Sequence, residues 1–298
     1  MLHLKYRPNT LEEFHGNSDL VTYLSNVKEW PHSVLFHGTS GCGKTTLARI
    51  MANKLNCKGN DLREVDSADF RGIDTIREIR KQAQYKPLEG DCRVWILDEA
   101  HKMSNDAQNA LLKILEDTPK HVYFMICTTD PQKLIATIRG RCSQHQVNPL
   151  SDKEMFKLLR SVVKQEGQSL IKSVYDQIIQ DGMGQPRNTL QILNQVLNVP
   201  EEKRLSVAKQ AAEEQSQSIE LCRALLDRSA WKKIATILTG LKDQEAESIR
   251  RHVLGYCNAV LLKSGNERAA VILEAFEEPL YNIGFPGLTL ACYRAVQG

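Results

Sequence analysis

Three glycines, a lysine and two threonines are grouped in the stretch GTSGCGKT at residues 38–45. An apolar run precedes this stretch, and a helix-forming run, KTTLARIMANKL, begins at its end. Glycines let successive backbone N–H groups curve around an anion, and the start of a helix adds unpaired N–H groups and partial positive charge. The pattern matches G-x-x-x-x-G-K-[ST] and predicts a nucleotide-phosphate site formed by Gly38, Thr39, Ser40, Gly41, Cys42, Gly43, Lys44, Thr45 and Thr46.

An acidic pair further along the chain is predicted to complete this site. The run RVWILD over 93–98 is typical of a buried strand, and it ends in Asp98-Glu99. In loops of this pattern the lysine, here Lys44, reaches the β- and γ-phosphates, and the hydroxyl of Thr45 ligates Mg²⁺. We expect Asp98 to hold Mg²⁺ through its water shell and Glu99 to polarise the water that attacks the γ-phosphate. These residues predict an ATP hydrolase that uses ATP and Mg²⁺.

The letters DEAH at 98–101 also name a large group of helicases. A helicase of that group needs two tandem nucleotide-binding domains, each with its own sheet. This chain contains one α/β region, and the sequence after it is helical. The DEAH stretch therefore does not indicate a helicase of that kind.

The elements that must position these residues follow from the alternation of apolar and helical runs. We expect strands at 33–38, 62–66, 93–98 and 122–129, with helices at 44–55, 72–84 and 104–117. Strands that are apolar throughout and separated by helices indicate a parallel sheet covered on both faces. Beyond residue 151 almost everything is helical. The predicted fold class is α/β then all-α, with domains at 1–150, 151–203 and 204–298.

Composition limits the class of protein. The chain has 298 residues, of which 42% are hydrophobic and 25% charged, as is typical of a soluble globular protein. No apolar run approaches the ~20 residues that span a bilayer, so we expect a cytoplasmic protein without a membrane partner. The net charge is only +3, so any contact with nucleic acid must come from a local patch. The eight cysteines form no CxxC pair, and we expect them to be reduced and without zinc.

Further motifs occur in a fixed order: KYRP at 5–8, CTTDPQKL at 127–134, IRGRC at 138–142 and GQPRN at 184–188. Together with GTSGCGKTTLAR and ILDEAHKMSNDAQNALLKILEDTP, they make the chain resemble AAA+ ATPases of the sliding-clamp-loader family. The similarity is to the bacterial γ/τ subunits of DNA polymerase III and to the small subunits of replication factor C. The resemblance implies a P-loop AAA+ domain, a small helical lid domain with the sensor-2 arginine, and a C-terminal helical collar domain for oligomerisation.

The resemblance also implies roles for residues outside the phosphate loop. It places Thr129 at the γ-phosphate and Arg187 on the phosphates in cis, and it packs three residues near the adenine: Tyr6, Arg7 and Pro8. From the sequence alone, Thr129 could equally cap a strand end, and Arg187 could be a surface arginine.

An arginine finger acting in trans is implied for Arg141, which would reach the ATP of the neighbouring subunit. Gly140 stands where the family usually has serine, which leaves Arg139 as a rival finger. An exposed helix-end arginine or an ion-pair partner is the alternative interpretation of Arg141.

Contacts with macromolecules are predicted for two neighbouring segments. A basic face of the 72–84 helix can contact DNA phosphates non-specifically, and it contains Arg77, Arg80 and Lys81. The corresponding family helices line a spiral around primer–template DNA, although a solvated basic face beside Asp74 and Glu78 is the alternative. In the loop 83–91, Tyr85 and Leu88 are hypothesised to insert into a pocket of the clamp.

As a clamp-loader subunit, the chain would open a sliding clamp and place it on primer–template DNA. Expected partners are further copies of itself, at least one distinct loader subunit in a pentamer, and DNA polymerase indirectly. The zinc module of bacterial γ/τ subunits and a long C-terminal tail are missing, which favours a phage-encoded subunit or a compact relative of replication factor C over a bacterial τ. The expected location is the cytoplasm of a bacterium or of a phage-infected cell.

Two alternatives belong to other classes. The first is an AAA+ DNA branch-migration motor or a replication-initiator ATPase. A protein of either kind would need a DNA-binding domain such as a winged helix. Residues 205–298 contain neither a basic recognition helix nor a strand wing. The second is a subunit that binds ATP only to stabilise its structure. The presence of Lys44, Asp98 and Glu99 argues against it.

Overall fold

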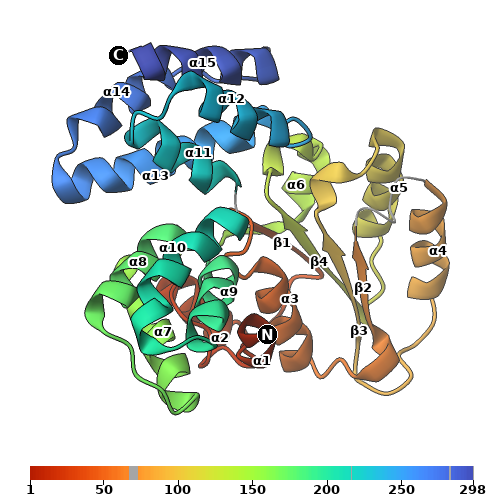
Figure 1. Cartoon of the computed structure of the whole chain (residues 1–298). Helices are drawn as coiled ribbons and strands as arrows, with labels where there is room; N and C mark the ends of the chain where they lie inside the picture. Colours follow the sequence, from red (N-terminus) through yellow and green to blue (C-terminus); the bar gives the residue numbers. More distant parts are fainter. Residues whose placement is uncertain (67–72, 216, 282, 298) are drawn as a thin grey trace. The chain divides into compact units, whose positions relative to one another are not determined.

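The computed structural model of the chain describes residues 1–66, 73–215, 217–281 and 283–297 (Figure 1). They form two compact units. The first contains residues 1–158 and 184–187, and the second contains 159–183 and the described part of 188–298. The three-domain division expected from the sequence stays a prediction.

A five-stranded parallel sheet forms the centre of the first unit. Its strands are β1 (Ser33–His37), β2 (Leu62–Asp66), β3 (Arg93–Asp98), β4 (Val122–Thr128) and β5 (Ser143–Gln146). They lie in the order β2-β3-β4-β1-β5, and every neighbouring pair is parallel. This order places β4 between the strand before the phosphate loop and the strand that ends in Asp98. Because carboxyl ends of parallel strands meet at one edge, the residues after β1, β3 and β4 gather there.

Helices cover both faces of this sheet (Figure 1). The helices of the first unit are α1 (Leu2–Lys5), α2 (Ser18–Asn26), α3 (Lys44–Lys54), α4 (Ile73–Ala83), α5 (Asn105–Glu116) and α6 (Ala136–Arg141), with three short 3-10 helices, η1 (Gly59–Asp61), η2 (Ala100–Lys102) and η3 (Pro131–Lys133). Gly72, the first residue of the predicted 72–84 helix, lies outside the described residues.

Alternate residues of the central strands enter two separate cores. Trp95 and Leu97 of β3 pack with α4 and α5, whereas Val94 and Ile96 pack with α3. A strand buried on both faces must be apolar throughout, which explains the continuous apolar runs in the sequence. The predicted α/β class with a parallel sheet is confirmed.

The fifth strand was not predicted. Its sequence, SQHQ, is polar, and its residues are exposed or half-buried. It lies at the edge of the sheet beside β1, where a strand does not need an apolar sequence on both sides.

The described secondary-structure elements of the second unit are all helices. Its helices are α7 (Asp152–Gln165), α8 (Lys172–Gly182), α9 (Pro186–Leu197), η4 (Glu201–Lys203), α10 (Arg204–Gln215), α11 (Gln217–Leu226), α12 (Trp231–Gly240), α13 (Ala246–Ser264), α14 (Glu267–Ala275) and α15 (Phe285–Gln297). The first residues of α7 and α9 belong to the first unit. None of these or the other described helices is both long and apolar enough to cross a membrane.

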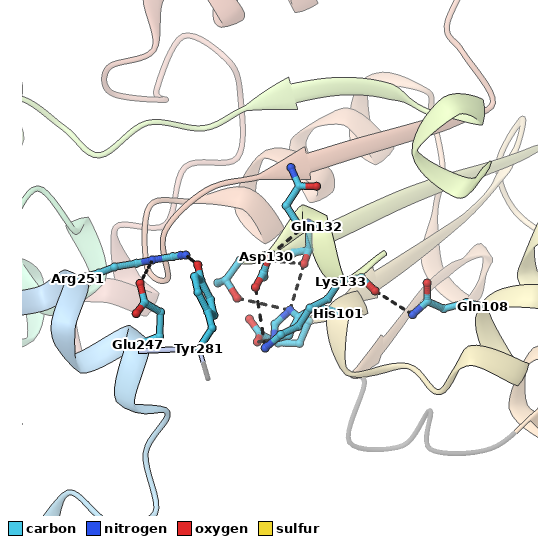
Figure 2. Close-up of polar contacts among 11 residues, drawn as sticks. His101, Gln108, Asp130, Gln132, Lys133, Glu247, Arg251 and Tyr281 are labelled. Atoms are coloured by element: carbon cyan, nitrogen blue, oxygen red, sulfur yellow. Dashed lines mark hydrogen bonds and ion pairs between the residues drawn. The ribbon is translucent and has the colours of Figure 1, made fainter. Parts of the chain in front are cut away.

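The second unit contains two largely buried ion pairs, one between two helices and one within a helix. The Asp181 carboxylate on α8 lies 2.7 Å from the Arg223 guanidinium on α11. On α13, Glu247 and Arg250 are 2.8 Å apart, and Glu247 also accepts a hydrogen bond from the backbone N–H of Leu280. The Glu247 carboxylate further contacts Arg251, which is bonded to Tyr281 (Figure 2).

Candidate phosphate and magnesium site

The loop between β1 and α3 requires glycine at the predicted positions. Gly38, Gly41 and Gly43 have φ angles of 150°, 72° and 106°, in the region that favours glycine. A Cβ at Gly38 would lie 2.1 Å from the carbonyl oxygen of Val147, so no other residue fits there. The Gly38 N–H donates to the carbonyl of Thr128, which holds the start of the loop against the end of β4.

Lys44 is the first residue of α3, and its side chain folds back over the loop. Its Nζ donates to the carbonyl oxygens of Gly38 at 2.9 Å and Thr39 at 2.8 Å, and the residue is only 5% exposed. These two carbonyl dipoles accept two of the three N–H groups of the ammonium but do not neutralise its charge. The loop therefore presents a buried positive charge beside the start of a helix, which suits a phosphate group.

Thr45 and Asp98, the two predicted magnesium ligands, are in contact. The Thr45 hydroxyl donates to Oδ2 of Asp98 at 2.7 Å, while Oδ1 accepts from the N–H of Glu99 at 2.9 Å. Hydroxyl and carboxylate oxygens are the ligands that Mg²⁺ prefers, and this ion takes its remaining ligands from water and phosphate. The donor set therefore fits Mg²⁺, although the described residues contain no cluster of three or more His, Cys, Asp or Glu that could hold a metal.

Glu99 directly follows the last residue of β3. It has a left-handed backbone conformation, and its carboxylate has two neighbouring side chains with nitrogen atoms. Its φ is 51°, and it directly precedes η2. Its Oε2 lies 3.5 Å from Nε2 of His101 and 3.6 Å from Nζ of Lys102. Left-handed backbone in a residue other than glycine is strained and is often found at functional sites.

His101 connects Glu99 to the end of β4. Its Nδ1 lies 3.1 Å from the hydroxyl of Thr128 and 3.4 Å from that of Thr129. Sequence reasoning identified Thr129, which is half-buried, but not Thr128, which is fully buried. It also missed His101, although the DEAH stretch contains it and the residue follows Glu99 closely.

Burial lowers the pKa of the His101 imidazole. The Glu99 carboxylate opposes this shift, as does Asp130, whereas the ammonium groups of Lys133 and Lys102 reinforce it. The net lowering favours the neutral ring at neutral pH.

Arg187 lies beside the phosphate loop, in the first turn of α9. Its N–H donates to the Gly41 carbonyl at 3.5 Å, and a Cβ at Gly41 would lie 3.4 Å from the Cβ of Arg187. Burial lowers the pKa of Arg7, and the charges of Arg49 and Arg187 lower it further. Arginines from the N-terminal segment, α3 and α9 therefore converge, with Glu64 paired to Arg49 at 2.5 Å. The adenine contacts expected of Tyr6, Arg7 and Pro8 stay a prediction.

The two candidate finger arginines lie on α6 and bind other groups. Arg141 is exposed, and its guanidinium lies 2.5 Å from the Glu116 carboxylate on α5. Arg139 is half-buried and donates to the side-chain oxygen of Gln132 at 2.9 Å. Neither of these side-chain partners belongs to the phosphate loop, and the role of either arginine in trans stays a prediction.

The predicted DNA-contacting residues of α4 lie on its exposed side. Arg77 forms an ion pair with Asp74 at 2.9 Å, and Arg80 and Lys81 are exposed. Ile76, Ile79 and Ala83 face the core on the other side of the helix.

Tyr85 and Leu88 project from the loop after α4, with exposed fractions of 67% and 75%. A buried carboxylate holds this loop, because Asp61 accepts hydrogen bonds from the N–H groups of Leu88, Glu89 and Gly90 at 2.8–3.3 Å. Arg93 lies 3.2 Å from the same carboxylate. No sequence pattern pointed to Asp61, because its partners are the Arg93 side chain and backbone N–H groups far along the chain.

The fold is that of AAA+ proteins, with a glycine-rich loop after β1, an acidic pair at the end of β3 and a threonine pair at the end of the strand between them. A family described as "DNA polymerase III, delta subunit" matches residues 60–151. The chain is therefore similar to DNA polymerase III subunits, as its sequence motifs indicated.

Individual relatives support this placement. The DNA polymerase III subunit gamma/tau of Mycobacterium tuberculosis is 36% identical over 222 residues, which cover 66% of this chain and 38% of the relative. The tau subunit of Escherichia coli is 28% identical over 310 residues, covering 92% and 48%. The gamma subunit of Buchnera aphidicola is 32% identical over 219 residues, covering 65% and 60%. The chain thus spans less than half the length of the first two.

Among solved structures, RuvB of Thermotoga maritima, a Holliday junction branch migration motor, superposes with a TM-score of 0.57 at 18% identity. The match covers 74% of this chain and 79% of RuvB. Similarity at this identity shows the shared AAA+ fold alone.

Proposed function

We propose that the chain is the ATPase subunit of a sliding-clamp loader, which opens a clamp and places it on primer–template DNA at the expense of ATP. The observation that carries the proposal is the 2.7 Å contact between Thr45 and Asp98 beside a phosphate loop. It occurs in a chain related to the gamma/tau subunits of DNA polymerase III.

In the proposed reaction each part of the site has one task. The loop N–H groups and Lys44 bind the phosphates, and Thr45 and Asp98 hold Mg²⁺, which neutralises charge on the β- and γ-phosphates when bound. Glu99 orients and polarises the attacking water. Thr129 and Arg187 contact the phosphates from the end of β4 and from α9. Lys44 needs only to turn from the carbonyls of Gly38 and Thr39 toward the phosphate.

Arg141 is the proposed finger that acts on the ATP of the neighbouring copy. It is exposed and paired with one carboxylate, whereas the Arg139 side chain is half-buried. A finger stabilises charge on the transferred phosphoryl group and is worth roughly 10³–10⁵ in rate where it has been measured. Because the charge would come from another subunit, hydrolysis would depend on assembly.

The proposed partners are those that the resemblance to clamp-loader subunits implies. They are the clamp, contacted through Tyr85 and Leu88, and DNA, contacted through Arg77, Arg80 and Lys81. Further copies and at least one distinct subunit would complete a pentamer, which would serve DNA polymerase indirectly. The cytoplasmic location also stays a prediction.

The test is steady-state ATP hydrolysis by the chain with its companion subunit, with and without clamp and primer–template DNA. We expect the two ligands to stimulate hydrolysis synergistically, and Lys44→Ala to abolish both hydrolysis and loading. Stimulation by DNA alone, accompanied by strand displacement, would instead support a branch-migration motor. Absence of hydrolysis under all conditions would overturn the proposal.

A further inference from the structure

His101 is the polar residue of the DEAH stretch to which the proposed function assigns no role. Its ring nitrogens nevertheless face two different parts of the site. Nδ1 lies 3.1 Å from the Thr128 hydroxyl, and Nε2 lies 3.5 Å from the Glu99 carboxylate. The ring therefore lies between the end of β4 and the carboxylate proposed to activate water.

Donor and acceptor chemistry fixes the direction of these contacts. An ionised carboxylate can only accept, so Nε2 of His101 carries the hydrogen that faces Glu99. A neutral imidazole has one N–H, so Nδ1 is then an acceptor, and it takes the hydroxyl hydrogen of Thr128. Thr128 can donate in this way and still accept the N–H of Asp130 at 3.1 Å, because a hydroxyl has one hydrogen and two lone pairs. The chain of contacts runs from Asp130 through Thr128 and His101 to Glu99.

The two threonines do not serve His101 equally. Thr128 is fully buried and lies at the shorter distance, whereas Thr129 is half-buried and lies 3.4 Å from Nδ1. Nδ1 has a single lone pair and can take one hydroxyl hydrogen. Thr128 therefore anchors the ring, and the Thr129 hydroxyl stays available to a phosphate oxygen.

We propose that His101, anchored by Thr128, is a positioning residue that orients the Glu99 carboxylate toward the attacking water. This inference rests on the proposed ATPase function. The 3.5 Å separation from Glu99 is long for a hydrogen bond, as contacts at catalytic groups often are before substrate binds. Without His101, the Glu99 carboxylate would present its oxygen in the wrong direction. The affinity of the chain for nucleotide would not fall.

The experiment compares His101→Phe, His101→Gln and Thr128→Val in the complete loader with clamp and primer–template DNA. Phenylalanine keeps a flat ring without nitrogens, and glutamine restores one donor and one acceptor on a planar group. We expect His101→Phe and Thr128→Val to lower kcat by about 10- to 100-fold, since a misplaced catalytic group costs up to about 100-fold. Nucleotide affinity should stay within about twofold, because ground-state binding is not affected. His101→Gln should recover part of kcat.

A second comparison separates positioning from a general structural effect. If His101 acts through Glu99, then His101→Phe should cause no further loss in a Glu99→Gln background, because residues that act as a unit are non-additive. Additive losses, or an unchanged kcat in His101→Phe where Glu99→Gln is inactive, would overturn this inference alone. A wild-type loader that hydrolyses no ATP would overturn the proposed function, and the inference with it.

The tautomer provides a test that does not depend on hydrolysis or on the folding of a variant. In ¹⁵N NMR of the wild-type chain at neutral pH, the His101 ring should carry its hydrogen on Nε2, with Nδ1 bare. A hydrogen on Nδ1 would contradict the chain of contacts and sink the proposal.

Discussion

Several side chains of the proposed site are held by one another and by the backbone. Lys44 donates to two loop carbonyls, and Thr45 donates to Asp98. Asp98 in turn accepts the N–H of Glu99. Each contact restricts a rotatable group before any ligand binds, so less conformational entropy is lost when the nucleotide arrives. At the scale of single residues, Thr45, Asp98 and Glu99 are therefore preorganised, whereas Lys44 must exchange its two carbonyl partners for the phosphate.

Asp98→Asn tests the magnesium role at this scale. Asparagine can still accept the Thr45 hydrogen bond, but it removes the negative charge that holds the cation. We expect Mg²⁺ to strengthen ATP binding much less in the variant than in the wild type, with folding unchanged. Titration of a fluorescent ATP analogue with Mg²⁺ and with EDTA measures this difference. An equal gain from Mg²⁺ in both proteins would exclude Asp98 as a ligand.

At the scale of elements, the order of strands decides which residues meet. β4 lies between β1 and β3, so its final residue is next to both the phosphate loop and the acidic pair.

A buried ion pair lies at the opposite end of β3, where Asp61 and Arg93 join η1 to the loop after α4. Burial opposes ionisation of Asp61, but hydrogen bonds from Glu89, Leu88 and Gly90 and from Arg93 outweigh it and lower the pKa of Asp61.

Asp61→Asn should destabilise the protein by about 3 kcal/mol, because it leaves Arg93 without its buried carboxylate. Urea denaturation measures the loss. Asp91→Asn is the matched control, since it neutralises an exposed carboxylate whose hydrogen bond from Asn56 an asparagine oxygen can still accept, and it should cost less than about 1 kcal/mol. Equal effects of the two substitutions would show that Asp61 does not hold the loop.

The pH dependence of this difference has a definite sign. Because the pKa of Asp61 is lowered on folding, its contribution is fully present above the unfolded pKa of about 3.9 and is lost as pH falls through the folded value. The stability gap between wild type and Asp61→Asn should therefore narrow below about pH 4.

At the scale of the whole molecule, the proposed reaction needs more than one copy. The recorded partners of Arg141 are Glu116 and a backbone carbonyl in its own helix, so its guanidinium would have to leave an ion pair to reach a neighbour. An exposed ion pair contributes about 0–1 kcal/mol, and assembly can readily exchange it for a phosphate contact.

Arg141→Ala should leave ATP binding intact and remove the stimulation of hydrolysis by DNA and clamp, by roughly 10³-fold or more in the assembled loader. Arg139→Ala is the matched control on the same helix and should retain the stimulation. Mixing Arg141→Ala with a Lys44→Ala chain tests whether the arginine acts in trans. Retained stimulation in Arg141→Ala would exclude Arg141 as the finger. Loss of stimulation in Arg139→Ala instead would assign the finger to Arg139.

The sequence by itself determined the α/β class, the phosphate loop and the acidic pair, because these are properties of short segments. A strand buried on both faces must be apolar, and a loop that approaches an anion needs glycine. Local patterns do not encode which strands become neighbours. Only the tertiary structure decided that β4 lies between β1 and β3, which brings Thr128 to His101. It also placed polar β5 at the sheet edge and buried Asp61 among backbone N–H groups, because these contacts join residues far apart in the chain.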